Sequence, residues 1–330
     1  SFGDKNILRL TILFRPGGRR GNKQSAENFI KKEAKIMQYI YLNGEFVESD
    51  NAKVSVFDHG VLYGDGVFEG IRAYSGRVFR LKEHIDRIFA AAKAIALDIP
   101  MSKAELAEVV KKTCAVNNLK DCYIRLVVTR GKGDLGLSPT NCAKPTVFCI
   151  AAGIKLYTAE QYEKGMAVIT SVQRRNKATI VDPQIKSLNY LNNILAKIEA
   201  NRAGAAEALM LNHDGIVTEC TGDNIFIVKD GVIYTPPVYV GILDGITRRT
   251  VIEVAAEIGV PLKETEFTLF NVYNADECFL TGTAAEAIAV TSVDGRKIGE
   301  GVCGPVTRKI LDAFQKAARS GEYGDEIIYK

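Results

Sequence analysis

The chain has 330 residues, of which 47% are hydrophobic and 25% charged, which favours two packed globular domains and excludes a disordered or collagen-like chain. No apolar run approaches the roughly 20 residues that a membrane helix needs, so a membrane span is excluded. The net charge is +4, but residues 1–36 alone carry +6 and the remainder −2, so nucleic-acid binding by a basic face has no support.

Residues 1–36 form a leader of mixed polarity, and regular patterning begins after it at Met37. We interpret Met37 as the functional start and the leader as an added or upstream extension outside the folded core. An organellar targeting sequence is the alternative, since the leader is basic but poor in Ser. It lacks the uninterrupted apolar stretch and the small-residue cleavage site of a secretory signal, so export is not expected.

The seven cysteines are odd in number, scattered along the chain and without a CxxC pair. This usage indicates reduced thiols and a cytoplasmic location. The three histidines do not stand at paired ligand spacing, so no metal site is expected.

The first half, residues 37–153, is predicted to be a small domain in which strands outnumber helices. Alternating residues around Asn43 and Gly44 predict a hairpin over residues 38–49, and Ser75 with Gly76 predicts a second strand pair over residues 68–81. Helices are predicted over about 82–97 and 103–117, followed by strands over 123–131 and 145–153.

A connector over residues 154–166 separates this half from a larger domain, residues 167–330. The second half is predicted to begin with a strand over 166–174 and a helix over about 189–204. Strands over 206–212, 225–231 and 232–237, a helix over 248–258, a strand-containing segment over 277–290 and a helix over 306–318 follow. Two mixed α/β domains with a cleft between them are the expected architecture.

Lys186, in DPQIKSLNYLNN, lies in a polar stretch directly before a predicted helix. By itself it indicates little, because most such lysines are solvated surface residues. In DGITRRTVIEVAAEIG, Gly245, Ile246 and Thr247 precede another helix, whose free backbone N–H groups and positive dipole end form a ready anion site. A simple Thr N-cap is the alternative. A second Gly/Thr turn, in TGTAAEAIAV, predicts an anion site of the same kind.

Two charged residues complete the pattern. Glu219, in TECTGDNIF, lies at a strand end before a Gly-containing turn, and Arg87, in EHIDRIFAAA, lies on a helix of the first half. Either could be an ordinary surface residue. Together with the lysine and the two turns, however, they supply the parts of a site for a phosphorylated pyridine, because a carboxylate can hold the protonated ring nitrogen and an arginine the phosphate.

Seven segments in order give the chain a broader resemblance. They are FDHGVLYGDGVFEGIR, EHIDRI, YIRLVVTRG, KSLNYLNN, TECTGDNIF, GITR and GTAAE. From about Gln38 to Ala318 the chain resembles the branched-chain aminotransferase family, in the fold type IV (class IV) group of pyridoxal-phosphate enzymes. This resemblance implies a two-domain fold like that of D-amino-acid aminotransferase, with pyridoxal 5'-phosphate at the domain interface.

The resemblance also implies a role for each cofactor residue. Lys186 would form the Schiff base and shuttle the proton between Cα and C4'. Glu219 would pair with the pyridine nitrogen, and Tyr190 would hydrogen-bond the 3'-oxygen. The remaining cofactor contacts would come from the ring-packing Leu243 and from the phosphate-holding Arg87, Gly245, Ile246, Thr247 and Thr283.

For the substrate, the resemblance implies two sets of residues, one that binds the α-carboxylate and one that surrounds the side chain. The carboxylate would be taken by Tyr123, Arg125, Thr283 and Ala284. The side-chain pocket would be shaped by Tyr63, Phe68, Gly70, Arg72 and Tyr157. Tyr63 would come from a neighbouring subunit, which makes a homodimer the minimal active unit.

The implied reaction is the reversible ping-pong transfer of the amino group of leucine, isoleucine or valine to 2-oxoglutarate. D-amino-acid aminotransferases, R-selective amine transaminases and aminodeoxychorismate lyases share the lysine and the phosphate site and remain alternatives. The D-specific enzymes use an Arg and a His in the loop after the TRG strand, and GKGDLGLSPTNCAKP has neither. A non-catalytic binding protein of the same fold is a further alternative, which the presence of Lys186 and Glu219 disfavours.

Overall fold

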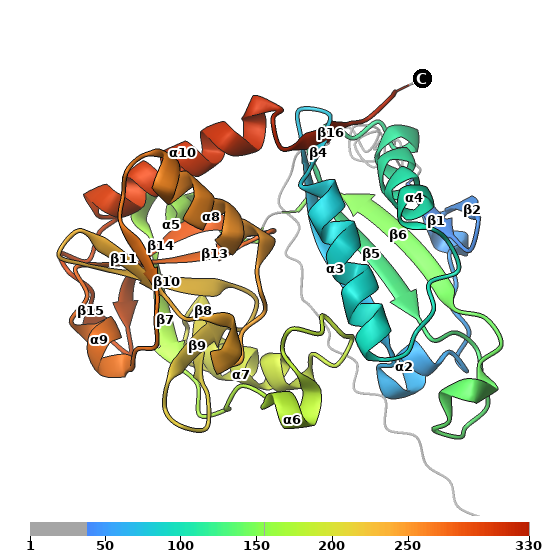
Figure 1. Cartoon of the computed structure of the whole chain (residues 1–330), viewed down its shortest axis with the longest axis horizontal. Coiled ribbons are helices and arrows are strands. Elements are labelled where there is room, and N and C mark those ends of the chain that lie inside the picture. Colours follow the sequence, from blue (N-terminus) through green and yellow to red (C-terminus); the bar gives the residue numbers. More distant parts are fainter. Residues whose placement is uncertain (1–37, 155, 330) are drawn as a thin grey trace, which may run out of the picture. The chain divides into compact units, whose positions relative to one another are not determined.

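A computed structural model describes residues 38–154 and 156–329 of the chain (Figure 1). The leader at residues 1–36 and the predicted start at Met37 lie outside the described residues. The described part contains two β-sheets with helices packed on them, which confirms the predicted mixed α/β architecture. Within it, no helix is both long and apolar enough to cross a membrane.

The first sheet has seven strands, and every neighbouring pair in it runs antiparallel. Both predicted hairpins are confirmed, because Asn43 and Ser75 take positive φ angles of 51° and 50° and are each followed by a glycine. The strand order is β16 (Gly324–Glu326), β4 (Arg77–Phe79), β3 (Gly66–Tyr74), β5 (Cys122–Thr129), β6 (Thr146–Ala152), β1 (Tyr39–Leu42) and β2 (Glu45–Glu48).

Two helices, α3 (Leu81–Ala94) and α4 (Lys103–Val116), cover one face of this sheet (Figure 1). Ile85 and Ile88 of α3 are buried in the core beneath them. A capping box between Ser102 and Glu105 starts α4. The shorter elements η1 (Ser49–Asn51), α2 (His59–Tyr63) and η2 (Pro139–Asn141) were not predicted, because helices of a few residues show no hydrophobic period.

The alternation of side chains along β3 determines what the first sheet offers to the second half of the chain. Val67 and Ile71 point into the helix-covered core, whereas Phe68 and Gly70 lie on the opposite face. Glu69 is on the helix side, where it binds residues of α3. The free face of β3 therefore becomes one wall of a cavity.

The predicted connector is not a simple linker. It contains the helix α5 (Ala159–Lys164), which begins at a capping box formed by Thr158 and Gln161. The following strand β7 (Met166–Thr170) is shorter than predicted, because the chain leaves the sheet after Thr170.

The second sheet closes on itself. β9 pairs with β8 and also with β10 at Glu219 and Asn224, so strands β10, β13, β14, β7, β8 and β9 form a closed ring. The ring strands not yet bounded are β8 (Glu207–Leu211), β9 (Val217–Cys220), β10 (Asn224–Lys229), β13 (Glu277–Gly282) and β14 (Glu286–Val293). Beside the ring lie β11 (Val232–Thr235), β12 (Leu262–Glu264) and β15 (Arg296–Lys297).

Helices surround this closed sheet. α7 (Leu191–Arg202) packs on β8, while α8 (Ile246–Glu257) and α10 (Pro305–Ser320) pack over the stacked rings of Phe226 and Phe279, whose centroids are 4.8 Å apart. The three long helices predicted for this half are therefore confirmed, with small shifts at their ends. The short elements α6 (Ala178–Val181), η3 (Val238–Val240) and α9 (Leu269–Tyr273) were not predicted.

The end of the chain returns to the first half. β16 pairs antiparallel with β4, so residues 324–326 join the first sheet and depart from the predicted assignment of 167–330 to the second domain. No pattern in this short polar stretch specifies its partner. The remaining strands follow the predicted order, with 39–152 in the first sheet and 166–297 in the second.

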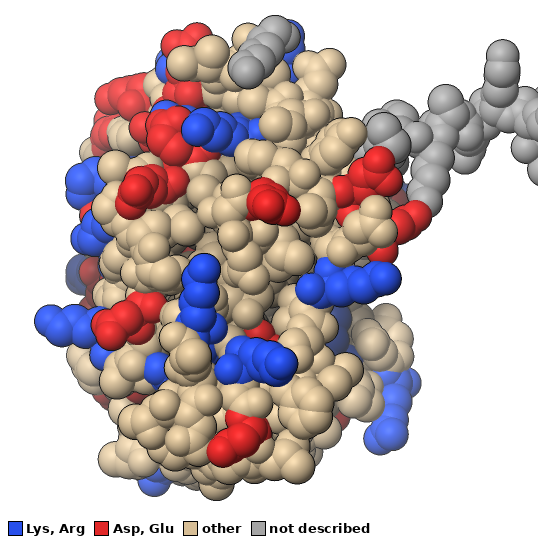
Figure 2. Space-filling view, turned by 90° about the vertical axis from the view of Figure 1, so that its right-hand side faces the viewer, with Lys and Arg blue, Asp and Glu red and all other residues tan. Residues whose placement is uncertain are grey.

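The charged side chains on the α4 side of the molecule are mixed in sign. Figure 2 shows Lys and Arg interspersed with Asp and Glu on this face, with no continuous basic area. This distribution agrees with the small net charge of the chain beyond its leader.

Candidate active site

A cavity of about 510 Å³ lies between the free face of the first sheet and one end of the closed sheet. Most of its walls come from β3, β5, the connector, α7 and the segment before it, the β9–β10 turn, the start of α8 and the β13–β14 turn, and α3 contributes Arg87. All the predicted site residues line this cavity except Tyr63 and Arg72. The tertiary structure thus brings together residues that are up to 216 positions apart, from Phe68 to Ala284.

Lys186 is held in the cavity by the backbone around it. Its carbonyl accepts the N–H of Phe68 at 3.0 Å, and Leu188 N donates to Gly66 O at 2.9 Å, so this segment runs along β3. The Lys186 Nζ donates to the Tyr190 hydroxyl at 3.1 Å and lies 4.6 Å from the centroid of the Phe68 ring. The amine is therefore fixed between an aromatic face and a phenol, and it is not the solvated surface lysine of the alternative interpretation.

The start of α8 forms the anion-binding end of the cavity. Gly245 is the N-cap, and no described side chain caps the helix, so the first backbone N–H groups are left for a ligand. Thr247 lies inside the first turn and is not the N-cap, which removes the simple capping role considered as its alternative. A larger residue at 245 would collide with Asn224, so glycine is needed where these two segments meet.

Arg87 reaches the same cavity from α3 but is already anchored from behind. Glu69 accepts its Nε and Nη2 at 2.7 and 2.8 Å, and the Asp244 carbonyl accepts its Nη1 at 2.8 Å. His84 contacts the same carboxylate, with Nδ1 and Oε2 2.7 Å apart. Burial alone would raise the pKa of Glu69, but the Arg87 guanidinium and His84 outweigh it and lower that pKa to about 2. A permanent carboxylate thus holds Arg87 in place.

The second Gly/Thr segment was predicted to bind an anion in the same way as a helix start. The structure corrects this prediction, because the segment is a turn between two strands. Thr281 and Gly282 end β13, and β14 begins at Glu286. Any anion bound here would meet the amides of a turn around Thr283 and Ala284, without the dipole of a helix.

Glu219 reaches the cavity because β9 contains a bulge. The register steps from Leu209–Cys220 to Leu211–Val217, so β9 has one residue more than β8 between these pairs. Val217 and Cys220 both point into the core of the closed sheet. The extra residue interrupts the strict alternation and turns Glu219 out toward the cavity.

The carboxylate of Glu219 is buried and accepts three hydrogen bonds, which leaves acceptor capacity on Oε1. Oε1 accepts Arg175 Nε at 2.8 Å, while Oε2 accepts Leu243 N at 3.0 Å and Asn224 Nδ2 at 3.1 Å. Burial raises the pKa of Glu219 above its ordinary value, and the adjacent Arg175 and the hydrogen bonds act in the opposite direction. Arg175 is itself buried, with 7% of its surface exposed. The ion pair gives the cavity a fixed negative group, which is what a protonated ring nitrogen requires.

The predicted substrate wall is formed by β3 and β5. Arg125 Nη2 donates to the Tyr123 hydroxyl at 2.9 Å, and the guanidinium lies 4.5 Å from the centroid of Phe68. A side chain at Gly70 would overlap the Tyr123 hydroxyl, so this glycine makes room for the phenol. These groups present one cation, one phenol and an aromatic ring to the cavity.

Arg72 was predicted to shape the side-chain pocket, and the structure does not place it there. It lies farther along β3 on the same face, where its Nη2 is 3.3 Å from Glu286 Oε1 and its guanidinium covers the Tyr74 ring. Glu286 begins β14 directly after the turn at residues 283–285. Arg72 therefore contacts the base of that turn and not the cavity itself.

Tyr63 also lies outside the cavity of its own chain. It ends α2, and its hydroxyl donates to the Leu135 carbonyl at 2.5 Å. Of its surface, 37% is exposed. This position agrees with the expectation that Tyr63 serves a neighbouring subunit, which stays a prediction.

A phosphorylated pyridine fits the groups present. The anion end has uncapped backbone N–H groups at α8, and the buried hydroxyl of Thr281, which also lines the cavity, has no hydrogen-bond partner among the described residues. A buried hydroxyl without a partner costs free energy unless a ligand satisfies it. Lys186 supplies an amine for covalent attachment, and Glu219 supplies the carboxylate for the ring nitrogen.

Several residues of the site were missed by the sequence analysis. Glu69 and His84 fix Arg87, while Arg175 and Asn224 fix Glu219. Glu69 had a signal, because it is a charged residue at a core-facing position between the apolar Val67 and Ile71. Arg175 had none, since it follows a strand in a polar loop like many surface arginines.

The sequence of this chain is similar to known aminotransferases over most of its length. The family model described as Amino-transferase class IV matches residues 66–293. A putative branched-chain-amino-acid aminotransferase of Methanocaldococcus jannaschii is 56% identical over 276 residues, which cover 84% of this chain and 95% of that protein. A D-alanine aminotransferase of Staphylococcus epidermidis is 39% identical over 287 residues, covering 86% of this chain and 99% of that protein.

The fold is also similar to solved structures of aminotransferases. The crystal structure of the Escherichia coli branched-chain amino acid aminotransferase gives a TM-score of 0.86 and 37% identity, and the match covers 88% of this chain and 100% of the other. A further branched-chain amino acid aminotransferase, solved in complex with N-(5'-phosphopyridoxyl)-L-glutamate, gives a TM-score of 0.84 and 37% identity. The same protein with pyridoxamine 5'-phosphate gives 0.85 and 38%, and each of these two matches covers 88% of this chain and 99% of the other.

Proposed function

Because the chain belongs to the class IV aminotransferase family, we propose that it is a branched-chain amino acid aminotransferase that moves the amino group of L-leucine, L-isoleucine or L-valine reversibly to 2-oxoglutarate. The proposed cofactor is pyridoxal 5'-phosphate, which alternates with its pyridoxamine form. The single observation that carries the proposal is that Lys186, Glu219 and the uncapped start of α8 line one cavity. The branched-chain names of its relatives support the substrate class.

The cofactor supplies an electron sink for the carbanion that forms when the substrate loses its Cα proton. Lys186 would hold the cofactor through its Nζ and afterwards carry the proton at Cα, since its amine is fixed in the cavity. The Tyr190 hydroxyl, 3.1 Å from Nζ, orients that amine. Glu219, held by Arg175, supplies the negative charge that keeps the ring nitrogen protonated.

The phosphate would be held by the α8 amides, Thr247, Thr283 and the anchored Arg87. The α-carboxylate would be taken by Tyr123, Arg125 and the turn amides at Thr283 and Ala284. Phe68 and Tyr157 would enclose the side chain and exclude water. A largely apolar wall of this kind favours branched aliphatic side chains over polar ones.

Specificity for L-amino acids is proposed from the loop over residues 131–145. This loop contains neither Arg nor His, the two residue types with which D-specific enzymes of the fold hold the carboxylate. In this chain the cations that line the cavity from the first half are Arg87 and Arg125. The carboxylate is therefore expected near Arg125 and Tyr123.

A homodimer is proposed as the minimal active unit, and two apolar surfaces support it. One lies around α2, where Val61, Leu135 and Leu137 are exposed by 62%, 69% and 79%. The other is a stripe on α7 at helical spacing, formed by Leu191, Ile194, Leu195 and Ile198. Exposed apolar surfaces of this kind mark protein interfaces, and contact at α2 would bring Tyr63 to a neighbouring site.

We further propose that residues 37–153 and 167–330 act as two domains joined by the connector, with the cofactor between them. A cytoplasmic location is proposed from the cysteines, because all seven are free thiols in the structure.

Two experiments test the proposed function. The first measures L-leucine, D-alanine and R-phenylethylamine as amino donors to 2-oxoglutarate in one coupled assay. Turnover of L-leucine alone is expected, and preference for either of the other donors would overturn the proposed specificity. The second reduces the holoenzyme with borohydride and maps the labelled peptide. Label at Lys186 is expected, and label elsewhere would overturn its assignment.

A further inference from the structure

Asp223 is a buried carboxylate in the cavity wall to which neither the sequence analysis nor the proposed reaction gives a role. It lies at the end of the β9–β10 turn with 5% of its surface exposed. Its Oδ2 accepts the hydroxyl of Tyr157 at 2.8 Å. Its Oδ1 lies against Gly282, where any side chain would overlap that oxygen.

Tyr157 belongs to the connector, which supplies a wall of the cavity through Ile154, Leu156 and Tyr157. A second hydrogen bond ties the same segment down, because the Tyr162 hydroxyl donates to the Ala285 carbonyl at 3.1 Å. The two tyrosine rings also pack edge to face, with centroids 6.1 Å apart. The connector thus contacts the β13–β14 turn directly through Tyr162 and indirectly through Asp223.

Asp223 is buried close to two other carboxylates, those of Glu207 and Glu219, which is an unfavourable place for a third negative charge. Burial and the nearby Glu207 raise the pKa of Asp223 to about 7, while the hydrogen bond from Tyr157 and the charge of Lys197 act in the opposite direction and Glu219 adds a smaller increase. Lys197 Nζ is 3.5 Å from Glu207 Oε1. The same oxygen also accepts hydrogen bonds from the Thr221 hydroxyl and from the backbone N–H of Ala208. The donor to the Asp223 side chain is a neutral phenol, that of Tyr157.

We propose that Asp223 is a positioning residue for the substrate side-chain pocket, which it completes by holding Tyr157 and the adjoining connector against the turn at residues 281–284. This inference rests on the proposed function and deepens it. Lys186 and Glu219 share no hydrogen bond with Asp223 among the described contacts, so loss of the Asp223 acceptor acts directly on the pocket wall, and Glu219 loses only the repulsion of a nearby carboxylate.

The kinetic test compares Asp223→Ala, Asp223→Asn and Tyr157→Phe with the double variant Asp223→Ala/Tyr157→Phe. KM for L-leucine is expected to rise by roughly tenfold in Asp223→Ala and in Tyr157→Phe, while kcat stays within about threefold. The double variant is expected to match the single ones, because both remove the same hydrogen bond. Asparagine still offers an acceptor oxygen, so KM of Asp223→Asn should lie nearer to wild type.

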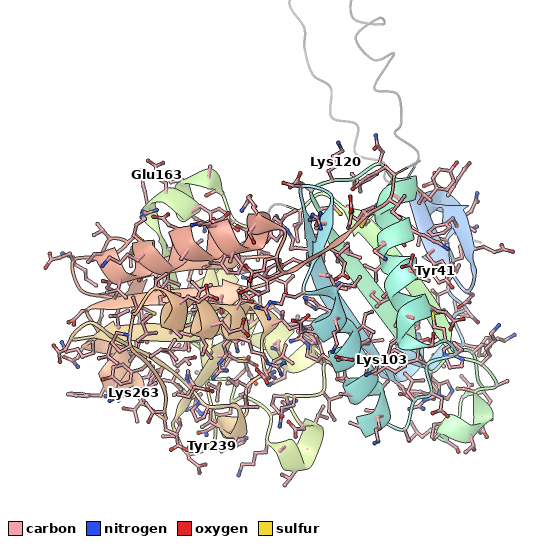
Figure 3. All side chains as sticks on the ribbon, turned by 45° about the horizontal axis from the view of Figure 1, so that its top comes forward. Tyr41, Lys103, Lys120, Glu163, Tyr239 and Lys263 are labelled. Carbon is pink, nitrogen blue, oxygen red and sulfur yellow. The ribbon has the colours of Figure 1, made fainter. Side chains whose placement is uncertain are left out.

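A second readout follows the connector itself. Hydrogen–deuterium exchange of the holoenzyme without substrate is expected to speed up in peptides from residues 156–165 in Asp223→Ala and Tyr157→Phe. Tyr239→Phe is the matched control, since Tyr239 is 76% exposed and points outward in Figure 3. Exchange and KM in this control should match wild type. The thermal transition and the cofactor absorbance of each variant establish that it is folded and loaded.

Three outcomes would overturn the inference. They are unchanged KM with unchanged exchange in Asp223→Ala, additive effects in the double variant, and a fall in kcat at constant KM. Failure of the proposed function looks different, because wild-type enzyme would then not turn over L-leucine at all. The exchange experiment would still report on the connector in that case, since it uses no substrate.

Discussion

Replacement of Arg175 by glutamine tests whether a buried ion pair sets the charge at the base of the site. Arg175 Nε lies 2.8 Å from Glu219 Oε1, and the two side chains are 8% and 6% exposed. Glutamine keeps hydrogen-bonding capacity and removes the positive charge. Because burial already raises the pKa of Glu219, loss of Arg175 should favour the neutral acid, which cannot stabilise a protonated ring nitrogen.

The size of the effect follows from the geometry. Charge centres about 4 Å apart attract each other by about 4 kcal/mol at an effective dielectric constant near 20. At roughly 1.4 kcal/mol per tenfold change, full loss of this attraction would reduce kcat by nearly 10³-fold. Solvent that enters the vacated space recovers part of the loss. We therefore expect kcat to fall on the order of 10²-fold.

The assay is steady-state transamination of L-leucine with 2-oxoglutarate by cofactor-loaded enzyme, from which kcat is obtained. Arg174→Gln is the matched control, because this neighbouring arginine is exposed and contacts the carbonyl of Ser171. The control should keep the wild-type rate, and Arg175→Lys should lose less than Arg175→Gln. A fully loaded, folded Arg175→Gln enzyme with kcat within twofold of wild type would refute the reasoning.

Single contacts lead to four further expectations. Glu219→Gln should retain cofactor by absorbance but lose most of its rate, and an unchanged rate would mean that another group protonates the ring. Lys186→Ala should fold normally by circular dichroism and lose transamination, and full turnover without added amine would contradict its role. Leu191→Asp on the exposed stripe of α7 should shift gel-filtration elution toward a monomer and reduce activity, whereas an unchanged elution volume would exclude this stripe from the interface. Glu69 has a pKa of about 2 in the folded protein against 4.5 for the free side chain, so it should add roughly 3 kcal/mol to the free energy of unfolding above pH 4.5. This contribution should be lost as the pH falls toward 2. In urea unfolding, the free energies of unfolding of wild type and Glu69→Gln should therefore converge over that pH range.

The long elements of the fold could be predicted because their signals are local. The period of α3, the turn at Asn43 and Gly44, and the alternation of the strands depend only on neighbouring residues. Short helices such as α2 and α5 were not predicted, because they are too short to show a hydrophobic period. The one sequence signal for α5 is the capping box at Thr158. The pairing of β16 with β4 was beyond prediction, because a strand of three residues has no pattern that names its partner.

The candidate site divides in a similar way. Lys186 and the start of α8 stand next to helices that the sequence shows, so their chemistry could be inferred in place. The resemblance implied a role for Arg72 in the side-chain pocket, but in the structure an ion pair with Glu286 holds this residue outside the cavity, and that long-range contact has no local signal.

By itself the sequence determined which chemical groups are available and on which local element each one stands, because helix periods, turns and strand alternation arise from contacts between near neighbours. Only the tertiary structure decided how these groups combine. The bulge in β9 that turns Glu219 outward, the choice of Arg175 as its partner and the contact between the connector and Asp223 all depend on strand register and long-range packing. Such contacts join residues that are 44 and 66 positions apart in these two pairs, and no local pattern encodes them.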